Sequence, residues 1–144
     1  MVKTSPVAVL VDTSVIADVI YKDPVWAPWA ADQLTAYAGA SRINPIIYSE
    51  LCHHAIGIGE VDQLVLNFGF QFDELPEEAL FLASQAYRAY KQRGDSKTAP
   101  LPDFFIGAHA QALGIPILTR DAGRYSSYFP GVQLICPWRA AGWA

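Results

Sequence analysis

Four acidic residues that lie far apart in the sequence could together bind a metal ion. Asp12 and Asp121 each follow a short apolar run, and Glu50 and Asp103 lie in segments that we expect to be helical. Carboxylate oxygens without histidine or cysteine partners favour Mg²⁺ or Mn²⁺. An ion of this kind can position and polarise a phosphodiester and activate a water molecule for in-line attack. The acids therefore suggest metal-assisted phosphodiester hydrolysis, provided that the fold brings them together.

The elements that carry these residues are indicated by apolar runs, helix caps and glycine stops. Short continuous apolar runs are typical of strands buried on both faces, as in a parallel sheet. Thr13 or Ser14 is a candidate cap for the first helix, and Asn44-Pro45 has the form of a cap and a first helical residue. Strands are predicted at Pro6–Val11, Arg42–Asn44, Phe70–Leu75, Ile115–Thr119 and Gln133–Ile135. Helices are predicted from Val15 to about Tyr21, at Trp29–Ala38, from Pro45 to a stop at Gly57, at Val61–Phe68, from Pro76 to a stop at Gly94, and from Phe104 to Leu113, with a polar loop at residues 95–101.

This alternation of strands and helices predicts one α/β domain with a mainly parallel central sheet and helices on both faces. The carboxyl ends of parallel strands share one edge, where ligand sites form. Asp12 and Asp121 lie at strand ends, and Asp103 starts a helix that runs back toward the next strand, so all should reach this edge together with Glu50. Two unit charges 4 Å apart repel by about 4 kcal/mol at an effective dielectric constant of 20. The acids must therefore bind protons or share a cation.

Each acid also has a simpler explanation when it is taken alone. Asp103 could cap its helix, Glu50 could be a solvated helix residue, and Asp121 could be a turn residue. Asp12 could be a cap or turn residue, although a buried charge needs a partner. A phosphatase with an aspartyl nucleophile is a rival role for Asp12, but Ser14 occupies the place of the usual second acid. The sequence has no P-loop lysine motif and no complete dinucleotide-binding glycine pattern.

Composition restricts the class of protein further. The chain has 144 residues, of which 52% are hydrophobic and 17% charged, so it can bury a full core. The net charge of −4 does not favour strong general attraction to nucleic acid or to an anionic membrane. No apolar stretch reaches the length of about 18 residues that a membrane span needs. Cys52 and Cys136 lack the spacing of a zinc site and are expected to be free thiols. We therefore expect a cytoplasmic protein without a membrane segment.

Four segments, VDTSVIAD, NPIIYSEL, LPDFFIGAHA and ILTRDAGRY, occur in this order and resemble a PIN domain. The pattern is similar, more narrowly, to the VapC-like toxins of type II toxin–antitoxin modules. The resemblance covers about residues 7–135, so we expect residues 1–144 to form a single PIN-like domain with a C-terminal tail at residues 136–144. It implies an endoribonuclease that depends on Mg²⁺ or Mn²⁺, forms a homodimer and is neutralised by a cognate antitoxin.

The resemblance also implies roles for individual residues. Asp12 and Asp103 match the principal metal ligands, and Glu50 and Asp121 match acids that bind the ion directly or through water. Thr13 matches the small hydroxyl residue that commonly follows the first acid.

An RNA substrate requires local positive charge near these acids. Arg124 and Arg120 are the candidates for substrate contacts. The alternative to a nuclease is a catalytically inactive PIN-like module that binds RNA or protein.

Overall fold

The chain folds into alternating strands and helices, as the sequence predicts. A computed structural model describes residues 8–94 and 101–137. The strands are β1 (Val9–Val11), β2 (Ser41–Ile43), β3 (Gln71–Phe72), β4 (Ile117–Leu118) and β5 (Leu134–Ile135). The helices are α1 (Thr13–Ile20), α2 (Ala27–Ala36), α3 (Pro45–Leu51), α4 (Ile58–Phe68), α5 (Glu77–Gln92), α6 (Leu101–Leu113) and α7 (Gly123–Ser126), with a 3-10 turn at Cys52–His54.

The strands form one sheet in the order β3-β2-β1-β4-β5, and every pairing between them is parallel. The predicted α/β class is therefore confirmed. Strand β1 lies in the middle of the sheet and is fully buried, which explains its uninterrupted apolar sequence. The chain moves from β1 to β2 and β3 on one side and places β4 and β5 on the other. A crevice at such a reversal, outside the carboxyl ends of the strands, is where ligands bind in open α/β sheets.

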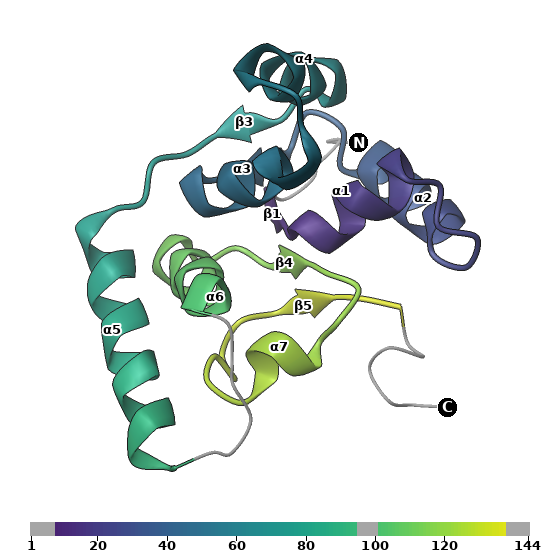
Figure 1. Cartoon of the computed structure of the whole chain (residues 1–144). Coiled ribbons are helices and arrows are strands. Elements are labelled where there is room, and N and C mark those ends of the chain that lie inside the picture. The colour runs from purple at the N-terminus through teal and green to yellow at the C-terminus, as the bar shows by residue number, and fades with distance from the viewer. Residues whose placement is uncertain (1–7, 95–100, 138–144) are drawn as a thin grey trace, which may run out of the picture.

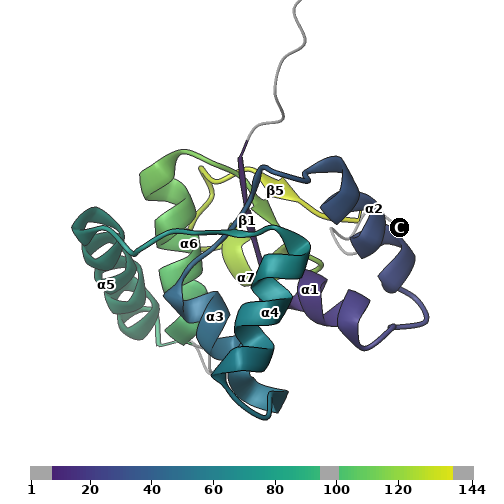
Figure 2. The same cartoon turned by 90° about the horizontal axis from the view of Figure 1, so that it is seen from above.

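Helices cover both faces of the sheet. Figure 2 shows α1 and α2 on one side of β1 and α5 and α6 on the other. Helix α5 packs along α6, and the short helix α7 also lies against α6 (Figure 1). The architecture is therefore α/β/α, and α6 contacts α3, α5 and α7.

A close contact at Gly107 fixes the position of α6. A Cβ atom on this residue would lie 2.8 Å from Cγ of Phe129 and closer still to two other atoms of the same ring. Phe129 is only 3% exposed, and its ring also packs against Phe104 on α6. Only glycine lets the helix approach the Phe129 ring this closely, so Gly107 sets the separation between α6 and the segment that follows α7.

Four helices, α1, α2, α4 and α6, begin earlier than predicted, and in α1 and α6 this changes the roles of the first polar residues. Helix α1 begins at Thr13, so the prediction that Thr13 or Ser14 caps it is wrong. Asp12 is the cap residue by position, but its side chain makes no capping hydrogen bond. Helix α6 begins at Leu101, so Asp103 lies in its first turn and does not start the helix as predicted. The polar side chains of Asp12, Thr13 and Ser14 instead bind residues on or near the crevice, as described below.

Other boundaries differ in smaller ways. The helix that was predicted to continue to Gly57 ends at Leu51 and passes into the 3-10 turn. Four of the predicted strands are longer than the observed ones, and the second is shifted by one residue, to Ser41–Ile43. Helix α7 was not predicted, since four residues are too few to show a helical period. The predicted strand residues Pro6 and Val7, residues 95–100 of the loop and residues 138–144 of the tail lie outside the described residues.

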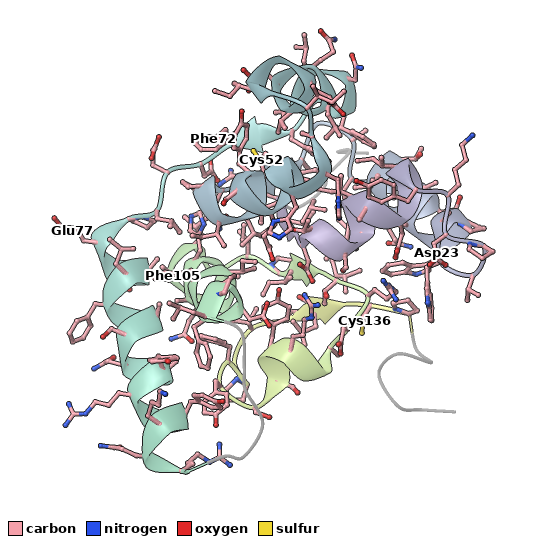
Figure 3. The ribbon with its side chains drawn as sticks, viewed as in Figure 1. Asp23, Cys52, Phe72, Glu77, Phe105 and Cys136 are labelled. Atoms are coloured by element: carbon pink, nitrogen blue, oxygen red, sulfur yellow. The ribbon has the colours of Figure 1, made fainter. Side chains whose placement is uncertain are left out.

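The two cysteines lie in separate parts of the molecule (Figure 3). Both are free thiols, and both side chains are partly buried. Burial raises the pKa of the Cys136 thiol above its ordinary value. The Cys136 thiol is therefore less readily ionised than a free cysteine, which disfavours a nucleophilic role for it.

None of the helices in residues 8–94 and 101–137 has both the length and the apolar character that crossing a bilayer requires.

Candidate active site

Three of the four acids surround the guanidinium group of Arg124. Its Nη1 atom lies 3.8 Å from Oδ2 of Asp12 and 3.7 Å from Oδ1 of Asp103. Its Nε atom lies 3.7 Å from Oδ2 of Asp121. These acids come from the end of β1, the first turn of α6 and the loop after β4. The structure therefore brings them together at the point where the strand order reverses.

Asp12 is fully buried and only partly satisfied. Its backbone N–H donates a hydrogen bond of 2.9 Å to the carbonyl oxygen of Leu118, which ties the end of β1 to β4. Its carboxylate oxygen Oδ2 accepts hydrogen bonds from Oγ1 of Thr119 at 2.8 Å and from Oγ of Ser14 at 3.2 Å. The other oxygen, Oδ1, is buried without a hydrogen-bond partner in the described part of the chain. An unpaired buried carboxylate oxygen is costly, so Oδ1 has a strong preference for a cation.

Glu50 joins the site through Thr13. The hydroxyl group of Thr13 donates a hydrogen bond of 2.8 Å to Oε1 of Glu50. Thr13 follows Asp12 directly at the start of α1, and Glu50 lies in the last turn of α3. The hydrogen bond therefore places the fourth acid beside the other three, and the negative charge of Glu50 acts on Asp103.

A buried hydrogen-bond pair connects the two helices that carry Glu50 and Asp103. Oδ1 of Asn44 accepts a hydrogen bond of 2.9 Å from the backbone N–H of Ile47, which caps α3 as the sequence predicts. Nδ2 of the same side chain donates to Nδ1 of His109 on α6, at 3.0 Å. Asn44 and His109 are both fully buried. Burial lowers the pKa of His109, so this imidazole stays neutral and can accept the amide proton.

Asp121 has two roles at once. It is 59% exposed at its side chain, and its Oδ1 atom accepts a hydrogen bond of 3.1 Å from the backbone N–H of Gly123. This is the turn role that its sequence context suggested. Its Oδ2 atom faces Arg124 across the mouth of the site. The turn therefore fixes the carboxylate that also belongs to the acidic group.

The acids act on each other's protonation. Burial raises the pKa of Asp103 to about 6, Arg124 opposes this rise, and the charges of Asp12, Glu50 and Asp121 add to it. Burial alone would lower the pKa of Arg124, but Asp12 and Asp103 outweigh it and the pKa is raised. Arg124 is therefore fully charged, while the carboxylate of Asp103 carries its charge at a cost.

Three residues of the site were not identified from the sequence: Ser14, Thr119 and Tyr125. The pairing of Val11 with Leu118 places Asp12 level with Thr119, and only strand register reveals this neighbour. Tyr125 is fully buried, and its hydroxyl group has no hydrogen-bond partner among the described residues. Burial raises the pKa of Tyr125 well above its ordinary value, and the charges of Asp12 and Asp103 raise it further. Its hydroxyl is therefore a fixed neutral group close to the acids.

Arg120 has a different position from Arg124. Its Nε atom lies 2.9 Å from Oδ2 of the buried Asp18 on α1, and its guanidinium lies over the ring of Trp26, 5.8 Å from the centroid. Burial raises the pKa of Asp18, and the positive charge of Arg120 offsets part of this rise. Arg120 thus joins the loop after β4 to α1, and Arg124 is the arginine that enters the acidic group.

The donors fit a hard divalent cation by their chemistry. Asp12, Asp103 and Asp121 supply carboxylate oxygens without histidine or cysteine, and Oδ1 of Asp12 lacks a partner. Among the described residues, however, no three His, Cys, Asp or Glu side chains already stand close enough together to hold a metal ion. Arg124 lies between the carboxylates. The group therefore has the right atoms for Mg²⁺ or Mn²⁺ but is arranged around a guanidinium.

An apolar groove begins beside the acids. Its volume is about 430 Å³, and it runs between α1, the end of α3 with its 3-10 turn, and α4. Thr13 and Glu50 form its end nearest the acids. The remaining lining residues are Ala17, Ile20, Tyr21, Leu51, His53, His54, Ala55, Glu60, Val61 and Leu64. A ligand in this groove would meet apolar walls with carboxylates at two points.

Known proteins share this fold. The family model described as PIN domain matches residues 9–127. Among solved structures, the DNA-bound VapBC of Salmonella typhimurium matches with a TM-score of 0.70 and 16% identity, covering 91% of this chain and 98% of that chain. A toxin–antitoxin complex from Klebsiella pneumoniae matches with a TM-score of 0.67 and 20% identity, covering 90% and 98%. VapBC2 of Rickettsia felis, bound to a DNA fragment from its promoter, matches with a TM-score of 0.68 and 16% identity, covering 90% and 98%. No curated protein sequence matches the chain.

Proposed function

This chain belongs to the PIN domain family, and on that premise we propose that it is a divalent-metal-dependent endoribonuclease, the toxin of a type II toxin–antitoxin module. The observation that carries the proposal is the meeting of Asp12, Asp103 and Asp121 around one point, with a buried oxygen of Asp12 left without a partner. Carboxylates gathered at the carboxyl edge of a parallel sheet are costly unless they serve a cation. The solved structures of similar fold are VapBC and other toxin–antitoxin complexes, which supports the same assignment.

In this proposal, Asp12 and Asp103 would be the principal ligands of Mg²⁺ or Mn²⁺, and Asp121 and Glu50 would hold the ion directly or through water. The bound ion supplies the charge that positions the phosphodiester and makes water acidic enough to attack it. The chain's own hydroxyl groups orient the ligands. Ser14 and Thr119 hold Oδ2 of Asp12 and leave Oδ1 free, so that Oδ1 would be available to the ion, and Thr13 holds Glu50. Asn44 and His109 keep α3 and α6 in register.

In this proposal, Arg124 contacts the phosphate of the RNA substrate. Its side chain is 39% exposed at the mouth of the acidic group, where a phosphate would approach. Arg120 is the weaker candidate, because its Nε atom lies only 2.9 Å from the buried Asp18, whereas the contacts of Arg124 with carboxylate oxygens are looser, at 3.7–3.8 Å. The net charge of −4 makes such local contacts more important than general attraction to RNA.

The partner in this proposal is a cognate antitoxin whose segment occupies the groove between α1 and α4. The groove offers apolar walls, and Tyr21 on its rim is 61% exposed. Glu50 and Glu60 add negative charge to its lining, so the bound segment would be apolar with a basic residue directed toward the acids.

The protein would act in the cytoplasm as a homodimer. Light scattering of the purified chain tests the dimer, and a monomeric mass would contradict it.

An inactive binding module is the second candidate. The position of Arg124 between the carboxylates favours it, because a permanently neutralised acidic group would not hold a metal ion. The four acids with their supporting hydroxyls count against it, since a binding module has no need to keep Oδ1 of Asp12 buried and unpaired.

Cleavage mapping separates the two candidates. Total cellular RNA is incubated with the purified protein in Mg²⁺ or Mn²⁺, with and without EDTA, and new 5′ ends are sequenced. We expect discrete cuts that EDTA, Asp12→Ala and Asp103→Ala each remove. The matched control is Asp32→Asn, an exposed acid on α2 whose loss should leave cleavage unchanged. Cuts that persist in EDTA would refute the metal mechanism, and an absence of cuts in either metal would favour the binding module.

A further inference from the structure

The contacts of Arg124 with the acidic group are electrostatic and loose. All three distances to carboxylate oxygens lie at 3.7–3.8 Å, beyond the length of a good hydrogen bond. One nitrogen, Nη1, is shared between Asp12 and Asp103. The side chain is 39% exposed, and it projects from the four-residue helix α7. Arg124 is therefore held in place by charge and not by directional bonds, and it has an open path to solvent.

The same contacts leave the acids incompletely neutralised. Three carboxylates face one guanidinium, and Oδ1 of Asp12 remains buried and unpaired. A guanidinium spreads a single charge over a broad plane, whereas a divalent cation concentrates two charges in a small volume. A small divalent ion can draw carboxylate oxygens inward around itself, which Arg124 cannot do. The guanidinium and a divalent ion would compete for the same oxygens.

We propose that Arg124 is an exchangeable internal counter-ion, which keeps the acids together in the metal-free protein and swings out of the group when Mg²⁺ or Mn²⁺ enters. This inference rests on the proposed metal-dependent function and adds a residue that opposes metal binding. It explains how three acids can stay close together before a metal arrives. It also fits the finding that, among the described residues, no three His, Cys, Asp or Glu side chains form a ready metal site while Arg124 lies among the carboxylates. Displacement places the guanidinium at the rim of the site, where a phosphate group approaches.

Calorimetric titration with Mn²⁺ tests the competition in the purified full-length protein. Arg124→Gln removes the charge and keeps a polar side chain. Because it deletes a competing cation within 4 Å of three ligands, we expect Mn²⁺ to bind this variant at least about tenfold more tightly than the wild type. The matched control is Arg88→Gln, an exposed arginine on α5, which should bind Mn²⁺ with the wild-type affinity. Equal or weaker binding by Arg124→Gln would overturn the inference and leave the metal mechanism intact.

Thermal unfolding supplies a readout independent of affinity. Without metal, Arg124→Gln should melt at a lower temperature than the wild type, because the acids lose their counter-ion. Saturating Mn²⁺ should remove most of this difference. A metal-free melting temperature equal to that of the wild type would contradict the counter-ion role. If neither protein binds Mn²⁺, both this inference and the metal-dependent function fail.

A measurement on the wild-type protein avoids any dependence on the folding of the glutamine variant. The Nε–Hε signal of Arg124 in a proton–nitrogen spectrum can be assigned with Arg124→Lys, which keeps the positive charge and deletes this signal. Titration with diamagnetic Mg²⁺ should move the signal toward the position of solvent-exposed arginines, in step with saturation of the site. A signal that stays in place while Mg²⁺ saturates the site would refute displacement.

Discussion

Replacing Asp103 by asparagine should stabilise the metal-free protein while it removes metal binding. Asp103 is 6% exposed, and its carboxylate lies among other acids. Burial raises its pKa from the ordinary value of 3.8 to about 6, with Arg124 opposing the rise. A carboxyl group with a raised pKa favours the folded state when it is protonated. This contribution is complete below pH 4 and is lost as the pH rises through about 6. At pH 8 the charged carboxylate of Asp103 therefore lowers the free energy of unfolding of the protein.

The size of this destabilisation follows from the shift in the pKa of Asp103. The difference between about 6 and 3.8 is about 2 units, which corresponds to ~3 kcal/mol in unfolding free energy at most. The site opens to solvent beside Arg124, so screening reduces the effect to about 1–2 kcal/mol. For a chain of this size, 1 kcal/mol shifts the melting temperature by about 2–4 °C. Asp103→Asn should therefore melt about 2–8 °C above the wild type at pH 8, and by roughly half as much at pH 5, where the unfolded carboxyl is already ionised but the folded one is mostly protonated.

The assay is thermal unfolding by circular dichroism in EDTA at both pH values. Asp32→Asn serves as the control, because it removes the same charge from an exposed position on α2. Its melting temperature should match the wild type at pH 5 and pH 8. When EDTA is replaced by Mg²⁺ at pH 8, the wild type should gain more than Asp103→Asn does. A variant that melts below the wild type at pH 8, or a difference that is the same at both pH values, would refute the electrostatic reasoning.

Three further variants test the packing and hydrogen bonds that position the acids. Gly107→Ala should destabilise the protein by about 1–3 kcal/mol in urea unfolding, because overpacking against Phe129 outweighs the better helix propensity of alanine; a more stable variant would contradict the contact. Asn44→Ala should cost about 2–4 kcal/mol, since it deletes the cap of α3 and the buried partner of His109. Asn44→Asp keeps the cap, so an equal loss in both variants would show that the cap contributes little. Thr13→Val should weaken Mn²⁺ binding by about tenfold through the freed Glu50, whereas Thr13→Ser should not, and unchanged affinity in Thr13→Val would remove Thr13 from the site.

The sequence by itself determined the class of fold. The continuous apolar runs of β1 and β4 and the helical spacing between strands are local properties, because they report which faces of each element are buried. From these runs the parallel sheet follows, and with it the edge on which Asp12 and Asp121 must lie. The meeting of the acids was therefore predictable from topology, while their metal-binding roles stay predictions that the variants above test.

Only the tertiary structure decided what lies between those acids. The hydroxyl group of Thr119 binds Asp12 from 107 positions away, and this contact depends on the register of β4 against β1. The place of Arg124 depends on a short helix that has no helical period of its own. The partnership of Asn44 with His109 depends on the packing of α3 against α6. Periodicity specifies which side of an element is buried, but contacts between distant side chains arise only when the packed elements fix their positions in three dimensions.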